Sequence, residues 1–107
     1  MTRRRRRFTP EAAEQARRAD AWWRENRPAA PALLASELHD AVERLETEPG
    51  IGQPHASKAL AGVRRAGLRR TRFHIYYVVR EPEILIVAVW SALRGEGPPL
   101  PSANQIK

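Results

Sequence analysis

Basic and aromatic side chains that could act on an anionic polymer gather in the second half of the sequence. Residues 49–80 carry one lysine, six arginines and no acidic residue. His74 and Tyr76 lie in that segment, and Trp90 and Arg94 follow it. Histidine can serve as a general base, and arginine can stabilise the negative charge that develops when a phosphodiester is cleaved. Without such chemistry, the same side chains could bind single-stranded RNA or an acidic protein.

The alternation within residues 72–80 predicts a strand that presents this chemistry on one side only. Successive side chains of a strand point to opposite faces of the sheet. One set is apolar and should lie in the core: Phe73, Ile75, Tyr77 and Val79. The other set forms a basic and aromatic surface: Arg72, His74, Tyr76, Val78 and Arg80. Residues 84–90 are apolar in both sets, which is typical of a strand that is covered on both faces.

Two amphipathic helices precede these strands. Residues 9–11 (TPE) provide a capping threonine, a first-turn proline and an acid at the positive end of a helix dipole. Apolar residues at helical spacing continue to Trp23, and a second such stripe begins near Leu34 and runs to about Thr47. The short link between them contains prolines. This pattern predicts a helical hairpin.

Together these elements predict an α+β fold, with an N-terminal helical hairpin packed on one face of a three- to four-stranded antiparallel sheet. The strands are residues 63–68, 72–80 and 84–90, while residues 50–61 are expected to form a loop. Residues 3–9 form either a fourth strand or a solvated basic tail. Because two helices cover only one face, the chain's own tail or a partner should cover the other. We assign residues 1–95 to one domain and residues 96–107 to a flexible tail rich in glycine and proline.

Composition excludes several classes of protein. The 107 residues allow one modest core, and the absence of cysteine excludes disulfides and cysteine-based zinc sites. No apolar stretch is long enough to span a membrane, so we expect a cytoplasmic protein without a membrane role. His39 and Glu43 lie one helical turn apart, but two ligands are too few, and neither a metal nor a cofactor is expected. The net charge of +7 indicates an acidic partner.

From Phe8 to Leu100 the order of elements and several short motifs resemble the ParE/RelE superfamily of toxins. Residues 22–28 (WWRENRP) are similar to the end of that family's first helix, and residues 45–52 (LETEPGIG) to its exit from the second. Residues 63–65 (VRR) and 72–79 (RFHIYYVV) resemble its central strands. Residues 88–95 (AVWSALRG) are similar to its closing motif A-V-W-H-A-R-R. Five motifs in the family's order make the resemblance fairly specific.

The resemblance implies the toxin of a type II toxin–antitoxin system, neutralised by a ParD-like antitoxin whose acidic C-terminal segment wraps the toxin. Through that antitoxin the toxin would associate indirectly with DNA. ParE-like members inhibit DNA gyrase and perform no chemistry, and the ParE-like branch is the one we favour. RelE-like members cleave mRNA on the ribosome, so this chain could instead be an endoribonuclease. A third reading, from a different class, is a small basic module that binds nucleic acid.

Two departures from the family pattern favour gyrase over RNA as the target. Ser91 stands where the motif has histidine, and Leu93 replaces one of the following arginines. A serine at its ordinary pKa is a poor general acid or base. These departures also leave open a toxin of weakened activity.

The residues expected to contact a target or the antitoxin are basic or aromatic: Arg64, Arg65, Arg69, Arg70, Arg72, His74, Tyr76, Trp90 and Arg94. We expect no catalytic residue in a gyrase inhibitor. If the protein is a ribonuclease, His74 would be the base and the charge would be stabilised by Arg64, Arg72 and Arg94.

Overall fold

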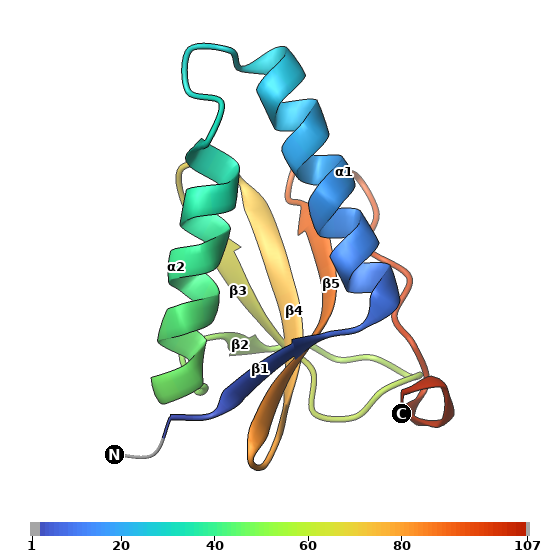
Figure 1. The fold of residues 1–107 in the computed structure, drawn as a ribbon. Helices are drawn as coiled ribbons and strands as arrows, with labels where there is room; N and C mark the ends of the chain where they lie inside the picture. Colours follow the sequence, from blue (N-terminus) through green and yellow to red (C-terminus); the bar gives the residue numbers. More distant parts are fainter. Residues whose placement is uncertain (1–2, 107) are drawn as a thin grey trace.

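The arginine-rich start of the chain forms an edge strand, β1 (Arg5–Phe8), which pairs in parallel with the last strand, β5 (Glu83–Ser91). The computed structural model describes residues 3–106, and Figure 1 shows β1 crossing below the two helices. This settles the choice between a strand and a solvated tail in favour of the strand. The sheet is therefore mixed, because β1 runs parallel to β5 while all other neighbouring strands pair in antiparallel fashion.

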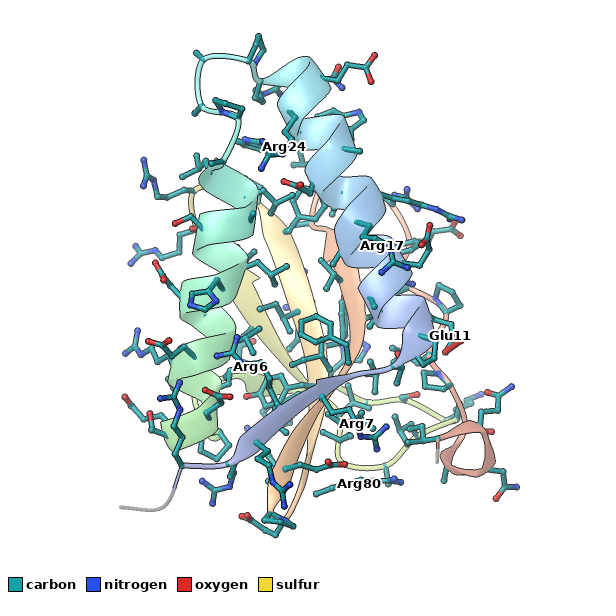
Figure 2. The ribbon with its side chains drawn as sticks, in the orientation of Figure 1. Arg6, Arg7, Glu11, Arg17, Arg24 and Arg80 are labelled. Carbon is teal, nitrogen blue, oxygen red and sulfur yellow. The ribbon has the colours of Figure 1, made fainter. Side chains whose placement is uncertain are left out.

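Acidic residues from distant parts of the chain explain why so many arginines fit into a strand. Arg4 donates to Glu81 at 2.6 Å, and Arg7 donates to Glu83 at 3.0 Å. Arg3 and Arg6 both donate to Glu46 on the second helix, at 2.7 and 2.9 Å. Figure 2 shows Arg6 and Arg7 on opposite sides of the β1 ribbon, as alternation requires. The four arginines are thus paired with three carboxylates, Glu46 on α2 and Glu81 and Glu83 near the start of β5.

The two helices form where the apolar spacing predicts them. Helix α1 (Pro10–Asn26) starts at Thr9, whose hydroxyl accepts a hydrogen bond from the Ala12 N–H. Helix α2 (Leu33–Thr47) follows a short proline-containing link. Buried side chains on α1 include Trp23, whose indole N–H donates to the Ala30 carbonyl at 2.8 Å and so fixes the link between the helices. Both helices lie over the same face of the sheet (Figure 1).

The sheet has five strands in the order β1-β5-β4-β3-β2, which corrects the expected count of three or four antiparallel strands. Strands β3 (Arg64–Leu68) and β4 (Phe73–Arg80) match the predicted segments closely, and both pair in antiparallel fashion with their neighbours. The additional strand is β2 (Gln53–Pro54), within the predicted loop. A strand of two residues, one of them a proline, carries no alternation that a sequence pattern could reveal.

A β-bulge shifts the phase of β5 relative to the sequence alternation. Tyr77 pairs with Ile86 and Tyr76 pairs with Ala88, so Val87 is the extra residue. Beyond the bulge Val89 joins Ile86 on the helix side, whereas strict alternation would group Val89 with Leu85. The same shift places Trp90 on the opposite side of the sheet from Ile86.

Two apolar clusters lie on the two faces of the sheet. The cluster under the helices contains Tyr77, Ile84 and Ile86. On the second face, Tyr76, Val78 and Leu85 pack with Leu60 and Val63 from the loop before β3. The sequence left open whether the chain itself or a partner covers this face, and the structure shows that segments of the chain itself cover it.

Part of the segment expected to be a flexible tail also contacts this second face. Leu100 and Ile106 pack against the cluster there, and residues Ala103–Gln105 form a short 3-10 helix, η1. Figure 1 shows this segment passing beside the sheet to η1. The mobility of the tail stays a prediction.

Candidate functional site

The strand register brings the predicted surface residues into two rows on the second face of the sheet. Gly67, His74 and Trp90 are cross-strand partners in one row. Arg65 and Tyr76 stand in the next row. Cross-strand partners have their side chains about 5 Å apart on the same face. Arg65, His74 and Trp90 are partly exposed and form one continuous surface, whereas Tyr76, which was expected on that surface, is only 3% exposed and packs in the apolar cluster of this face.

An imidazole from outside these strands completes the cluster. His55 follows β2 and is held by a hydrogen bond from its backbone N–H to the Val63 carbonyl at 2.8 Å. Its ring meets Tyr76 edge-on at 4.9 Å between centroids, and the His74 ring meets the same tyrosine at 6.3 Å. We call His55, Arg65, His74, Trp90 and Arg94, together with the buried Tyr76 ring that lies beside both imidazoles, the basic–aromatic face.

The surroundings of His74 favour its neutral form. Partial burial lowers the pKa of His74, and the nearby Arg65 and His55 lower it further. A neutral imidazole can accept a proton or a hydrogen bond at pH 7. Within a face that otherwise carries arginines, His74 therefore adds an acceptor and little positive charge.

Arg94 and Trp90 form the end of this face nearest the C-terminus. The Arg94 guanidinium stacks over the Trp90 ring at 4.1 Å from its centroid. The Trp90 indole N–H donates to the Glu96 carbonyl at 2.9 Å, which fixes the ring. A stacked guanidinium keeps its N–H edges free for carboxylate or phosphate, so this pair is well suited to anion recognition.

Arg64 does not belong to this surface. It pairs in register with Tyr77, whose side chain lies under the helices, so Arg64 projects to the opposite face from His74. Its guanidinium donates to the Gly52 carbonyl at 2.6 Å. Arg64 therefore holds the loop between α2 and β2, and it lies apart from the residues that could contact a target on the second face.

The remaining predicted arginines lie in the turn between β3 and β4. Arg69, Arg70 and Arg72 are exposed, and Arg72 has a positive φ of 66°. The Glu37 carboxylate on α2 accepts hydrogen bonds from the N–H groups of Arg70 and Thr71, at 2.8 and 3.0 Å. The turn is thus fixed by its backbone, and its three arginine side chains are exposed to solvent.

Sequence reasoning missed His55 and Glu37 as contributors to this region. His55 lies in a loop without periodicity, and only the fold brings it to Tyr76. Glu37 could not be found by pattern, because the backbone N–H groups that it accepts from belong to Arg70 and Thr71, which lie 33 and 34 residues further along the chain.

Comparison with known proteins agrees with this architecture. Residues 6–95 match the family model for the ParE toxin of the type II toxin–antitoxin system, parDE. The chain belongs to the ParE toxin family. Among solved structures, a chain of the chromosomal ParDE TA system from P. aeruginosa has the same fold, with a TM-score of 0.68 at 20% identity. That match covers 82% of this chain and 95% of the other. A search of the curated proteins found no match.

The whole basic–aromatic face falls within the part of the chain that matches the ParE family. Ser91 and Leu93, the two positions that depart from the family motif, lie between Trp90 and Arg94 at the end of this face. The Ser91 hydroxyl accepts a hydrogen bond from the Leu93 N–H at 3.2 Å, and Leu93 itself is 74% exposed. Ser91 therefore closes the turn after β5, and Leu93 presents an apolar side chain where the motif has an arginine.

Two features are absent from the part of the chain that the structure describes. Across residues 3–106, no cluster of three or more histidine and acidic side chains is arranged to hold a metal ion. Neither of the two long helices in the same range combines the length and apolar character needed to cross a bilayer.

Proposed function

We propose that this ParE family member is a toxin that inhibits DNA gyrase by binding it, and that a ParD-like antitoxin with an acidic C-terminal segment holds it inactive. The basic–aromatic face is the surface we assign to gyrase. The antitoxin would also link the toxin indirectly to DNA. The family membership supports the toxin role, and the likeness in fold to a chain of a ParDE system supports the choice of antitoxin.

The observation that carries the choice of gyrase is the separation of Arg64 from His74. In a ribonuclease built on Arg64, Arg72, His74 and Arg94, the base and the charge-stabilising groups must meet at one phosphate. Arg64 lies on the helix side of the sheet and donates to the Gly52 carbonyl, while His74 lies on the other side. This arrangement supports a protein that acts by binding.

The test is an assay of DNA supercoiling by purified gyrase, with and without the purified toxin. We expect supercoiling to be inhibited in proportion to toxin concentration, and the inhibition to be reversed by the antitoxin. In cells, brief induction should stop DNA synthesis before protein synthesis. Undisturbed gyrase together with an early arrest of protein synthesis would contradict the proposal.

A second candidate function, RNA cleavage, is favoured by the cluster of two imidazoles and Arg65. His74 would accept the proton of a ribose 2′-hydroxyl as that oxygen attacks the phosphorus. His55 would donate a proton to the departing 5′-oxygen, leaving a 2′,3′-cyclic phosphate and a 5′-hydroxyl. Arg65 would stabilise the charge on the phosphate. Incubation of ribosome-bound mRNA with the wild type and with His55→Ala and His74→Ala, followed by analysis of the RNA ends, tests this candidate.

Nucleic-acid binding without a protein partner would have a different signature. Affinity for RNA or DNA that depends on arginine–phosphate contacts falls steeply as salt increases. The gyrase complex should instead form with fixed stoichiometry. Titrations of a single-stranded RNA and of the gyrase subunits at two salt concentrations separate the two cases.

A further inference from the structure

β5 pairs with β4 along its whole length, but on its other edge the end of β1 leaves the second half of β5 without a neighbouring strand. β1 stops at Phe8, which pairs with Ile86, and no strand of the described chain continues along β5 beyond that point. The Val89 N–H, which would bond to such a strand, donates instead to the side-chain oxygen of Gln15 on α1 at 2.9 Å. Along this edge a groove of about 710 Å³ opens between α1 and the segment that follows β5.

The lining of this groove is rich in aromatic and exposed apolar side chains. All three tryptophans of the chain line it: Trp22, Trp23 and Trp90. Trp22 is 47% exposed and Leu93 is 74% exposed, and these two residues come from opposite walls. Large apolar side chains that gather in one exposed place on a small soluble domain mark a surface that binds a partner. We call this feature the tryptophan groove.

The charged residues of the tryptophan groove have a single sign. Arg18, Arg27 and Arg94 line it, and among residues 3–106 no acidic side chain does so. Arg27 lies over the Trp22 ring at 5.3 Å, and Arg94 lies over the Trp90 ring at 4.1 Å. Arg18 also contacts Glu14 on its own helix at 3.4 Å, which leaves Arg27 and Arg94 as the main free charges. Two stacked guanidinium groups therefore flank an apolar floor.

We propose that the tryptophan groove binds an acidic segment of the antitoxin. An apolar side chain of that segment packs between Trp22 and Leu93, and its carboxylates pair with Arg27 and Arg94. The identity of the partner rests on the proposed function, whereas the chemistry of the segment follows from the groove itself. A second copy of this chain is a poor occupant, because a protein of net charge +7 would bring like charges together at this groove.

The position of the three tryptophans provides a direct readout. Because every tryptophan of the chain lines the groove, a change in intrinsic fluorescence on titration reports its occupation. The probes are the purified product of the antitoxin gene encoded with this toxin and a synthetic peptide of its acidic C-terminal segment, made without tryptophan. Calorimetry with the same probes gives the affinity independently of the fluorescence.

Two double variants test the apolar and the charged contacts separately. Trp22→Ala with Leu93→Ala removes the apolar walls, and Arg27→Glu with Arg94→Glu reverses the charge. Each should weaken binding of the antitoxin and of the peptide about tenfold or more, as loss of central aromatic and arginine contacts does. All of these side chains are exposed or line the groove, so circular dichroism should show unchanged folding.

Matched controls are available elsewhere on the surface. Ile51→Ala removes an apolar side chain that is 43% exposed in the loop after α2. Arg44→Glu reverses an exposed charge on α2, which contributes no residue to the groove. Both controls should bind the antitoxin within about twofold of the wild type, a difference too small to represent a lost contact.

The outcomes separate this inference from the proposed function. If the antitoxin binds the wild type and both groove variants equally, the groove assignment is wrong while the toxin–antitoxin pairing stands. If the variant with Trp22→Ala and Leu93→Ala, neither of which belongs to the basic–aromatic face, keeps the antitoxin but no longer inhibits gyrase, the occupant is gyrase and the inference is overturned. If the antitoxin fails to bind the wild type, both the pairing and the groove assignment fail.

Discussion

The Tyr77 hydroxyl accepts a hydrogen bond from the Gly52 N–H at 2.9 Å, and a Cβ atom at residue 52 would lie only 2.5 Å from that oxygen. The same hydroxyl donates to the Pro49 carbonyl at 2.6 Å. Burial raises the pKa of Tyr77, so the hydroxyl stays protonated and keeps its donor. One core side chain therefore ties down the loop that connects α2 to the sheet, and the loop can approach it so closely only because residue 52 is glycine.

We expect Tyr77→Phe to lower the free energy of unfolding by about 1 to 3 kcal/mol, because it leaves two backbone groups without their partner. Gly52→Ala should cost a similar amount, since the added methyl group forces the ring or the loop to move. Urea denaturation measures both. If the variant that carries both substitutions loses no more stability than either single variant, the two substitutions disrupt the same contact, as the geometry requires.

Arg64→Ala should destabilise the fold by about 1 to 2 kcal/mol, because its guanidinium supports the same loop through the Gly52 carbonyl. From the sequence alone, this variant would be expected to keep the fold intact and to lose toxicity. Arg94→Ala should keep the melting temperature and lose activity in the gyrase assay. Equal melting temperatures for both variants would contradict the assignment of Arg64 to the loop.

Glu46→Gln should destabilise the protein at neutral pH by about 1 to 3 kcal/mol, since its side chain is 6% exposed and accepts hydrogen bonds from Arg6 and Arg3. The Arg6 hydrogen bond is the main cause that lowers the pKa of Glu46, and the Arg3 hydrogen bond adds to it. The stabilisation is therefore present above the ordinary pKa of 4.5 and is lost as the pH falls through the folded value. Glu43→Gln, at a mostly exposed neighbouring position, should change stability little at any pH.

His74 should titrate below the ordinary histidine pKa of about 6.5, which NMR can follow directly. The unfolded chain then binds the proton more strongly, so the His74 contribution to stability rises as the pH increases from the folded pKa and is complete above about 6.5. Arg65→Ala should raise the pKa of His74 towards its ordinary value. An unchanged titration in that variant would mean that Arg65 does not face the imidazole.

Leu45→Ala should lower the free energy of unfolding by about 2 to 5 kcal/mol, because Leu45 is 2% exposed within the helix-side cluster. Leu38 occupies an equivalent place in the sequence pattern but is only partly buried. Leu38→Ala should therefore cost less than Leu45→Ala, although the sequence suggests equal costs. Thermal or urea unfolding of the two variants shows whether their losses of stability are unequal, as the structure predicts, or equal, as the sequence suggests.

The two helices and β4 were predictable because each carries a strong period along its own residues, and β5 was predictable as an unbroken apolar run. Within the predicted core set of β4, Phe73, Ile75 and Tyr77 pack in the helix-side cluster, as alternation predicts, whereas Val79 is 36% exposed. The bulge at Val87 was not predictable, since one extra residue leaves no mark in a run that is apolar at every position. The sequence could not decide whether residues 3–9 form a strand, because the acids that neutralise their arginines lie 40 or more residues away.

The candidate site was partly predictable for the same reason. His74, Tyr76 and Arg65 follow from the alternation of two strands, and the strand pairing brings them together. The side of the sheet on which Arg64 lies could not be predicted, because arginines at both of the first two positions of β3 leave its alternation undefined. His55 and the tryptophan groove depend on where loops and helix ends meet, and local periodicity contains no information about that.

The pairing of β1 with β5 also determines how early during its synthesis the chain can fold. Residues 5–8 emerge early from the ribosome, but their partners, residues 83–86, follow only when most of the chain has been translated. Until then helix α1 lacks β5, the strand on which it packs, and contacts this distant in sequence form late. A chain interrupted before residue 83 therefore lacks both the basic–aromatic face and the tryptophan groove, so β5 must be translated before either binding surface can exist.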